Sequence, residues 1–218
     1  MAKHLEVGII GLGKFGLSMA LALQDMGHSV IGIDASESRM VLAQENMEHV
    51  YKADASQTSV LSSLHFHEMD HVIISVGDRV EKSLTIVLNL QDLGMKHIWV
   101  KAANDEHRKI LLRMGVERVV LPEEDAAFMA AHQLVQPGML DIVPKYGGIA
   151  IQELPVEEWD EKTLIELDLI RKYTVIVLGV RRRHTDDIDF VPNAHTRLRK
   201  GDTLLVVGKL DTISKLHP

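Results

Sequence analysis

The sequence predicts an α/β fold in which a doubly wound parallel sheet is followed by a small α+β domain. Before residue 122, six apolar runs of strand length alternate with segments whose apolar residues have helical spacing. A glycine-rich turn, GLGKFG at 11–16, directly follows the first of these runs. After a stretch punctuated by proline and glycine at 137–148, the pattern changes to short strands with little helix.

The composition is that of a soluble globular protein. Of the 218 residues, 46% are apolar and 25% are charged. There is no cysteine, no apolar run of about 18 residues and no signal-peptide pattern at MAKHLEVG, so we expect a cytoplasmic protein without disulfides. The net charge of −7 argues against a nucleic-acid partner, and we interpret the arginines at 181–183 as a solvated strand end.

The first predicted strand, 7–10, leads into glycines with the spacing of a dinucleotide fingerprint. Gly11 permits the tight turn, Gly13 leaves room for a phosphate close to the backbone, and Gly16 lets the next helix pack near the strand. The phosphate would lie at the amino end of the helix that starts near Phe15, where unpaired N–H groups and the helix dipole favour negative charge. Alternatively, the glycines only make a tight strand-to-helix turn.

The second predicted strand, 29–33, ends in an acid. Asp34 lies 18 residues after Gly16, which is close to the position of a ribose-binding acid in this fold. The alternative is that Asp34 merely caps the next helix, 37–47, for which Ser36 is also a candidate cap.

A polar turn follows the third predicted strand, 49–53. Asp54 and Ala55 in this turn lie where the adenine end of a ligand crevice is expected, so we predict that they contact the adenine or the ribose. Asp54 has a second interpretation as the cap of a helix at 57–64.

The rest of the sheet follows the same alternation. The fourth strand, 71–76, is an apolar run that suits a central parallel strand, and we expect the backbone of Ser75, Val76 and Gly77 to lie over the ligand. A helix at 80–93, a strand at 97–101, a helix from Asn104 to Met114, a strand at 119–121 and a helix at 123–136 complete a Rossmann-like sheet of order 3-2-1-4-5-6. Lys101, at the end of the fifth strand, is a further candidate nucleotide contact.

We therefore predict a nucleotide-binding domain at 1–136, a linker at 137–148 and a small α+β domain at 149–218. The last domain should contain a strand at 149–153, a helix at 163–169, a strand at 174–181, a hairpin-like close and a final strand at 203–207 after a turn at Gly201 and Asp202. It offers no catalytic constellation, so we predict no catalytic residue and do not expect an enzyme.

The alternative is an NAD-dependent oxidoreductase, which would need a proton-transfer residue beside the nicotinamide. His71, His97 and His107 are available but lack an orienting motif. The one close histidine pair, His65 and His67, is expected to have a surface role, because a metal site needs three or four converging ligands.

Several segments resemble one family along nearly the whole chain: VGIIGLGKFG at 7–16, IGIDAS at 31–36, KADAS at 52–56, HVIISVG at 71–77, WVKAANDEH at 99–107, MGVERVVLPEEDAA at 114–127 and RLRKGDTLLVVG at 197–208. The chain is similar to the cytosolic RCK regulatory subunits of bacterial Ktr and Trk potassium uptake systems.

This resemblance implies a regulatory ring in place of an enzyme. It implies an amino-terminal RCK domain that binds ATP or ADP, or NAD or NADH, and a smaller carboxy-terminal RCK domain. It also implies a homo-oligomeric, octameric gating ring docked at the inner face of the cell membrane on a potassium-translocating subunit of the KtrB or TrkH type. An RCK regulator of another cation channel or antiporter is the alternative.

The resemblance also assigns roles to individual residues. In the family the acid after the second strand holds the adenosine ribose, which corresponds to Asp34, and the polar turn corresponds to Asp54. A glutamate near the phosphates of neighbouring subunits helps to bind Mg²⁺ or another cation, which corresponds to Glu123. From the residues alone, Glu123 is a first-turn acid favoured by the helix dipole.

The chain departs from the family pattern at two places. The family fingerprint usually reads GLGRFG, with an arginine that reaches the terminal phosphate of ATP, whereas this chain has Lys14. Lysine keeps the charge but lacks the planar fork, which leaves the preference between ATP and ADP open. Some relatives bind a cyclic dinucleotide at the carboxy-terminal domain, and in the corresponding stretch, 169–173, the arginine is displaced by one position.

Overall fold

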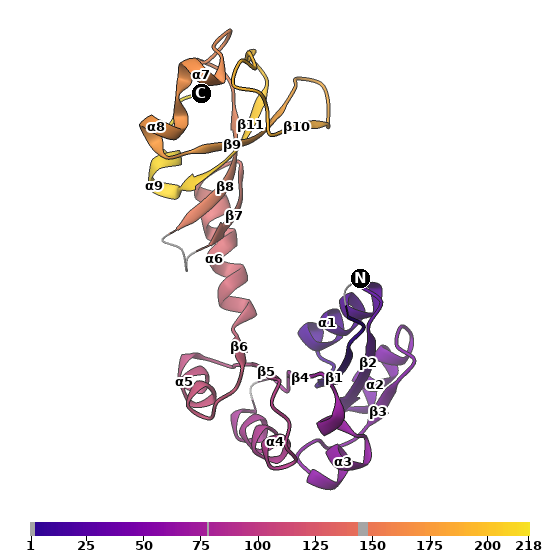
Figure 1. Cartoon of the computed structure of the whole chain (residues 1–218). Helices are drawn as coiled ribbons and strands as arrows, with labels where there is room; N and C mark the ends of the chain where they lie inside the picture. The colour runs from indigo at the N-terminus through magenta and orange to yellow at the C-terminus, as the bar shows by residue number, and fades with distance from the viewer. Residues whose placement is uncertain (1–2, 78, 144–147) are drawn as a thin grey trace. The chain divides into compact units, whose positions relative to one another are not determined.

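The computed structural model describes residues 3–77, 79–143 and 148–218 (Figure 1). The chain divides into two compact units, Met1–Pro122 and Glu123–Pro218. Each unit has its own sheet and its own hydrophobic core. Among the described residues, no helix combines the length and the apolar character that a membrane crossing requires.

The amino-terminal unit alternates strands with helices, as predicted. Its elements are β1 (Glu6–Ile10), α1 (Lys14–Asp25), β2 (Ser29–Asp34), α2 (Glu37–Gln44), β3 (Val50–Lys52), α3 (Thr58–Ser63), the 3₁₀ helix η1 (Phe66–Glu68), β4 (His71–Ile74), α4 (Val80–Asp92), β5 (Ile98–Lys101), α5 (Asp105–Arg113) and β6 (Arg118–Val120). The strands are parallel and follow the order β3-β2-β1-β4-β5-β6, which confirms the predicted topology.

Two predicted boundaries are wrong by a few residues. Strand β4 ends at Ile74 and not at residue 76, because the chain then leaves the ladder and passes close to Gly11. Helix α2 ends at Gln44, and Met47 buries its side chain in the core beyond the helix end.

Both faces of the parallel sheet are buried, and this packing holds β1, the strand that leads into the glycine turn, in place. Along β1, side chains alternate between the faces. Val7 and Ile9 pack in one core cluster with Ala20 of α1, whereas Ile10 packs in the other with Leu61 of α3. Helices on both sides of a parallel sheet bring the carboxyl ends of β1, β2 and β4 to one edge.

The carboxy-terminal unit is built on an antiparallel sheet, which confirms the predicted small α+β fold. Its strands follow the order β10-β9-β11-β8-β7. Its elements are α6 (Pro122–Val135), β7 (Met139–Val143), β8 (Ile149–Pro155), α7 (Leu164–Leu167), α8 (Leu169–Tyr173), β9 (Ile176–Arg181), β10 (Ile188–Phe190), β11 (Thr203–Lys209) and α9 (Leu210–Ile213).

The single helix predicted at 163–169 is two short helices. Thr163 caps α7 in a capping box with Glu166, and the chain then adopts a left-handed conformation at Asp168, with φ of 50°, before α8 begins. A second left-handed residue, Thr174, delays the start of β9 to Ile176. Neither Asp168 nor Thr174 is a glycine, so no sequence signal marks these breaks.

The predicted linker at 137–148 contains strand β7, which pairs with β8. Pro144 and Gly147, two of the turn residues on which that prediction rests, lie outside the described residues. Helix α6 groups with the carboxy-terminal unit, whereas the sequence pattern assigned it to the amino-terminal domain. The domain boundary at 137–148 stays a prediction.

The arginines at 181–183 are not simply a solvated strand end, as predicted, because two of them donate hydrogen bonds to carboxylates. Arg181 donates to Glu153 at 3.1 Å, and Arg182 donates to the buried Asp202 at 2.6 Å. Asp202 also accepts the backbone N–H of Arg183 at 3.1 Å. Two of these three guanidinium groups therefore form hydrogen bonds within the carboxy-terminal unit.

Candidate nucleotide-binding site

A cleft of about 480 Å³ lies at the carboxyl ends of β1, β2 and β4. This volume lies within the usual range of small-molecule sites. Strand β1 lies between β2 and β4 in the sheet, so the cleft sits where the strand order reverses, which is the usual ligand site of open α/β sheets. The predicted contacts Gly11, Asp34, Ala55 and Gly77 are among the residues that line it.

Two glycines of the turn are required by the protein's own backbone. Gly11 has φ of 95°, and a Cβ there would lie 2.2 Å from the carbonyl oxygen of Ser75. A Cβ on Gly16 would lie 2.0 Å from the carbonyl oxygen of Gly11. Any larger residue at these positions must therefore displace backbone.

Gly13 differs from the other two because the chain itself does not require a glycine there. Its φ of −70° suits any residue, and the atom nearest to a Cβ at this position would be Arg39 Nη1, at 4.0 Å. The space above Gly13 is therefore open, and Arg39 is a lining residue of the cleft. Open space at the second glycine is what close approach of a phosphate needs.

The amino end of α1 adjoins this space. Helix α1 begins at Lys14 with no hydrogen bond from a capping side chain and no acid in its first turn. The first N–H groups of a helix have no partner within the helix, so those of Lys14, Phe15 and Gly16 can donate to an anion. The Lys14 side chain is exposed and makes no ion pair in the described part of the chain.

Asp34 holds the glycine turn and the start of α2 together. Its Oδ2 accepts the N–H of Leu12 at 2.8 Å, and its Oδ1 accepts the N–H of Ser36 at 2.8 Å. Arg39 Nη1 lies 3.4 Å from Oδ2. A carboxylate offers about four acceptor positions, so ribose hydroxyls can still donate to Asp34. The interpretation of Asp34 as a helix cap is wrong, because its partner is the N–H of Ser36, which precedes α2, and the Ser36 side chain does not cap α2 either. The ribose contact of Asp34 stays a prediction.

Asp54 stabilises the turn after β3. Its Oδ1 accepts the N–H of Ser56 at 3.0 Å and the Ser56 hydroxyl at 2.8 Å, and Lys82 Nζ lies 2.8 Å away. The Lys82 ammonium and then the Ser56 bonds lower the pKa of Asp54 from 3.8 to about 2. Helix α3 begins after Gln57 without a side-chain cap, so Asp54 does not cap it.

In a Lys82→Gln variant, we expect the pKa of Asp54 to rise from about 2 toward 3.8, because its largest stabilising partner is lost. Since the folded-state pKa is lowered, the stabilisation from this pair is complete above the unfolded-state pKa and is lost as the pH falls through about 2. An NMR titration of the side-chain carboxyl carbons measures this shift. Asp70, whose pKa is lowered by Lys3, should titrate unchanged; an unchanged Asp54 would contradict the assignment.

Three basic residues that line the cleft could not be identified from the sequence pattern. Arg39 of α2, Arg79 at the start of α4 and Lys82 of α4 all line it. Arg79 is exposed and has no ion pair among the described residues. Single basic residues on exposed helix faces carry no sequence pattern, so only the fold could bring them together.

Several predicted contacts lie outside the lining of the cleft. Ser75 is buried, and its carbonyl oxygen occupies the space beside Gly11. Lys101 ends β5, which is separated from β1 by β4. Glu123 is an exposed first-turn acid of α6 and belongs to the carboxy-terminal unit. In the stretch 169–173, which forms α8, Arg171 Nε donates to Asp168 at 2.6 Å.

The histidines considered for proton transfer lie elsewhere as well. His107 is buried in α5, where its Nδ1 accepts the N–H of Ala103 at 3.1 Å and burial lowers its pKa. His71 and His97 lie at the amino ends of β4 and β5, the edge of the sheet opposite the cleft. His65 and His67 both pair with Glu68 at the surface.

Comparisons with known proteins give consistent results. The family model of the TrkA-N domain matches residues 7–122, and that of the TrkA-C domain matches residues 151–218. The chain is 31% identical to Ktr system potassium uptake protein C of Bacillus subtilis over 97% of this chain and 96% of that protein. It is 30% identical to Ktr system potassium uptake protein A of Vibrio alginolyticus, over 96% and 94% of the two chains.

A solved structure, the GsuK channel bound to NAD, resembles the fold. The TM-score is 0.56 at 20% identity, and the match covers 98% of this chain but 38% of the channel chain. The chain thus spans less than half of the length of that structure, and the likeness concerns the fold alone.

Proposed function

This chain belongs to the family of proteins with TrkA-N and TrkA-C domains, and on that premise we propose that it is the cytoplasmic, nucleotide-sensing regulatory subunit of a potassium uptake system. The relatives named for Ktr potassium uptake match nearly its full length, which supports potassium transport as the process it serves. The potassium-translocating partner would be a separate membrane subunit of the KtrB or TrkH type.

The observation that carries the proposal is the open space at Gly13 beside the amino end of α1. The chain gives no internal reason for a glycine there, while the neighbouring N–H groups and the basic residues Arg39 and Arg79 favour an anion. Asp34 at the end of β2 supplies an acceptor for ribose hydroxyls. A place for a phosphate after β1 and an acceptor for ribose hydroxyls at the end of the adjacent strand β2 together suit a nucleotide.

We assign the terminal phosphates of ATP or ADP to contacts with Lys14, at the amino end of α1, and with Arg79, which lines the cleft. NAD or NADH is the alternative ligand, and the NAD-bound state of the structurally similar channel supports that class. The basic residues that line the cleft belong to α2, to α4 and to the residue directly before α4, so a change in phosphate number would act on both helices.

A nucleotide that bound two ring conformations equally would regulate nothing. Moving a gate from 1:99 to 99:1 takes about 5.5 kcal/mol of differential binding, which eight sites would share at roughly 0.7 kcal/mol each. Small differences in phosphate contact at each of the eight sites would be sufficient to move the gate.

The octameric ring belongs to the same proposal. So do a cation such as Mg²⁺ near Glu123 and a cyclic dinucleotide at α8.

Reconstitution of this chain with a potassium-translocating subunit tests the function. We expect potassium flux into proteoliposomes to differ between saturating ATP and saturating ADP, and calorimetry to show direct binding of both. Identical flux in the two nucleotides would contradict the regulatory mechanism, and the absence of any binding of ATP, ADP, NAD or NADH would contradict the site.

The same measurements on a Lys14→Arg variant test the role of Lys14. Arginine restores the planar fork that can bind a phosphate in two places, so the preference for ATP over ADP should increase. An unchanged preference would remove Lys14 from the terminal-phosphate contact while leaving the rest of the site intact.

A regulator of another cation channel or antiporter is the alternative within the family, and flux through the potassium subunit separates the two. An oxidoreductase is disfavoured by the placement of its candidate proton-transfer residues. His71 and His97 lie at the opposite edge of the sheet, and His107 is buried in α5.

A further inference from the structure

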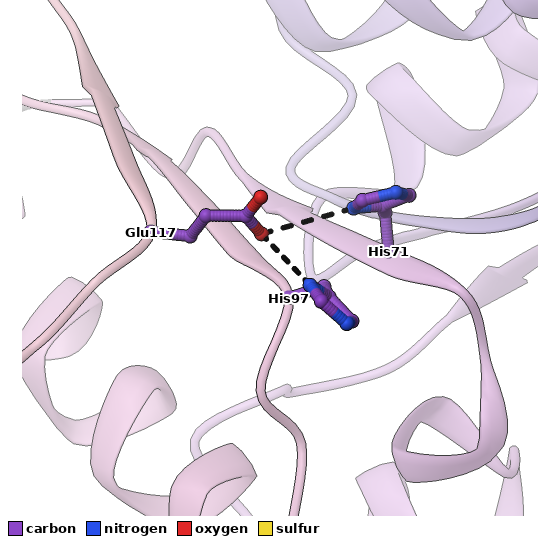
Figure 2. Close-up of side chains that lie close together, drawn as sticks. All are labelled: His71, His97 and Glu117. Atoms are coloured by element: carbon purple, nitrogen blue, oxygen red, sulfur yellow. Dashed lines mark hydrogen bonds and ion pairs between the residues drawn. The ribbon is translucent and has the colours of Figure 1, made fainter.

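Three side chains converge at the amino ends of adjacent strands (Figure 2). His71 is the first residue of β4, His97 directly precedes β5, and Glu117 directly precedes β6. Because β4, β5 and β6 are parallel neighbours, their amino ends meet at one edge of the sheet. The nucleotide cleft lies at the other edge, about 13 Å away along the four residues of β4.

The distances within this triad are close to those between ligands of one metal ion. Figure 2 shows the Glu117 carboxylate to one side of the two rings, with Oε2 facing both of them, 3.1 Å from His97 Nδ1 and 4.0 Å from His71 Nδ1. One ligand atom from each residue lies within 4.8 Å of the others. Four ligands at 2.0–2.1 Å around a tetrahedral ion are about 3.4 Å apart, so shifts of an ångström or less would complete the coordination.

The ring of His71 carries the strongest local signal. Its Nδ1 is buried and has no hydrogen-bond partner among the described residues, although it faces Glu117. A buried polar atom without a partner costs free energy, so such atoms usually have a partner that remains to be identified. Trp99 packs edge-on against the same ring, with centroids 6.2 Å apart, and so helps to fix its orientation.

We propose that His71, His97 and Glu117 form a site for a divalent transition metal, with Zn²⁺ as the best fit. Two imidazoles and one carboxylate are a known three-ligand set for zinc, and water fills the fourth position. Mg²⁺ and Ca²⁺ prefer oxygen ligands alone, so this donor set selects against them. The metal would join three strands that are distant in sequence. The site does not depend on the proposed nucleotide function.

Calorimetric titration of the full-length chain with ZnCl₂, without nucleotide, tests the site. We expect one ion per chain, and a rise in Tm of about 5 °C at a hundredfold excess over Kd. His97→Ala should lower the affinity at least about tenfold, since loss of even an indirect partner of a metal ligand costs that much. Co²⁺ should give the visible spectrum of a tetrahedral nitrogen and oxygen site.

His49→Ala is the matched control, because His49 directly precedes β3 at the same edge of the same sheet but outside the triad. It should bind Zn²⁺ like the wild type. Glu117→Gln removes the carboxylate at nearly constant volume and decides the question if His97→Ala does not fold. Equal Zn²⁺ affinities in all variants would show adventitious binding by other histidines. No Zn²⁺ binding at all would show that Glu117 only forms ion pairs with His71 and His97. Either result overturns the proposal.

Discussion

Gly11→Ala is expected to lower the free energy of unfolding by about 4 kcal/mol, the largest stability effect that the nucleotide site predicts. The residue has φ of 95°, where an L-residue is strained. In addition, the new Cβ would lie 2.2 Å from the carbonyl oxygen of Ser75 and 2.6 Å from its carbonyl carbon. These are backbone atoms of the segment after β4, so no side-chain rotation can relieve the clash.

Urea denaturation followed by circular dichroism measures this loss. Gly13→Ala is the control in the same turn, because its φ of −70° and its open surroundings accommodate a methyl group. Its free energy of unfolding should change by no more than about 1 kcal/mol. Its nucleotide affinity should nevertheless fall, since the methyl group occupies the space assigned to the phosphate.

The two variants thus separate the two roles of the glycine turn. Wild-type stability in Gly11→Ala would mean that the turn is not held as described. Wild-type nucleotide affinity in Gly13→Ala would mean that the phosphate does not approach the backbone at this point. The fingerprint spacing predicts these roles, and the structure adds the backbone contact that makes Gly11 necessary and the open space at Gly13.

The amino-terminal unit was predictable because several local signals agree. A buried run, a glycine turn and an acid at the end of the next strand all favour the same doubly wound sheet. The carboxy-terminal unit was less predictable because its helices after α6 are short and break at residues without a signal. Helix α7 has four residues and α8 has five, and Asp168 adopts a left-handed conformation between them.

The same contrast separates the site residues. The place of Asp34 in the cleft could be predicted, because one helix and one strand set its distance from the glycine turn. Its contact with the ribose stays a prediction. Arg39, Arg79 and Lys82 could not be predicted, because each is a single basic residue whose position in the cleft depends on the packing of its helix. Likewise, His71 and His97 are far apart in the sequence, and only the pairing of β4 with β5 brings them together.

Asp34→Asn is expected to weaken ATP binding by about 10- to 100-fold for each ribose hydroxyl that the carboxylate accepts. The reason is that a hydrogen bond to a charged acceptor contributes about 1.5–3 kcal/mol, and the amide nitrogen of asparagine cannot accept one. The variant also loses an acceptor for the N–H of Leu12 or Ser36. Its binding must therefore be measured well below its Tm, with the fold checked by circular dichroism.

Comparison of ATP with 2′,3′-dideoxy-ATP isolates the ribose contact from this loss of stability. The wild type should bind ATP more tightly than the dideoxy analogue, whereas Asp34→Asn should bind the two almost equally, since the hydroxyls then have no charged acceptor. Asp54→Asn is the matched control, because Asp54 is not among the residues that line the cleft, whereas Asp34 is. If Asp54→Asn loses the discrimination and Asp34→Asn keeps it, the polar turn after β3 holds the ribose, and the role of Asp34 is confined to the glycine turn.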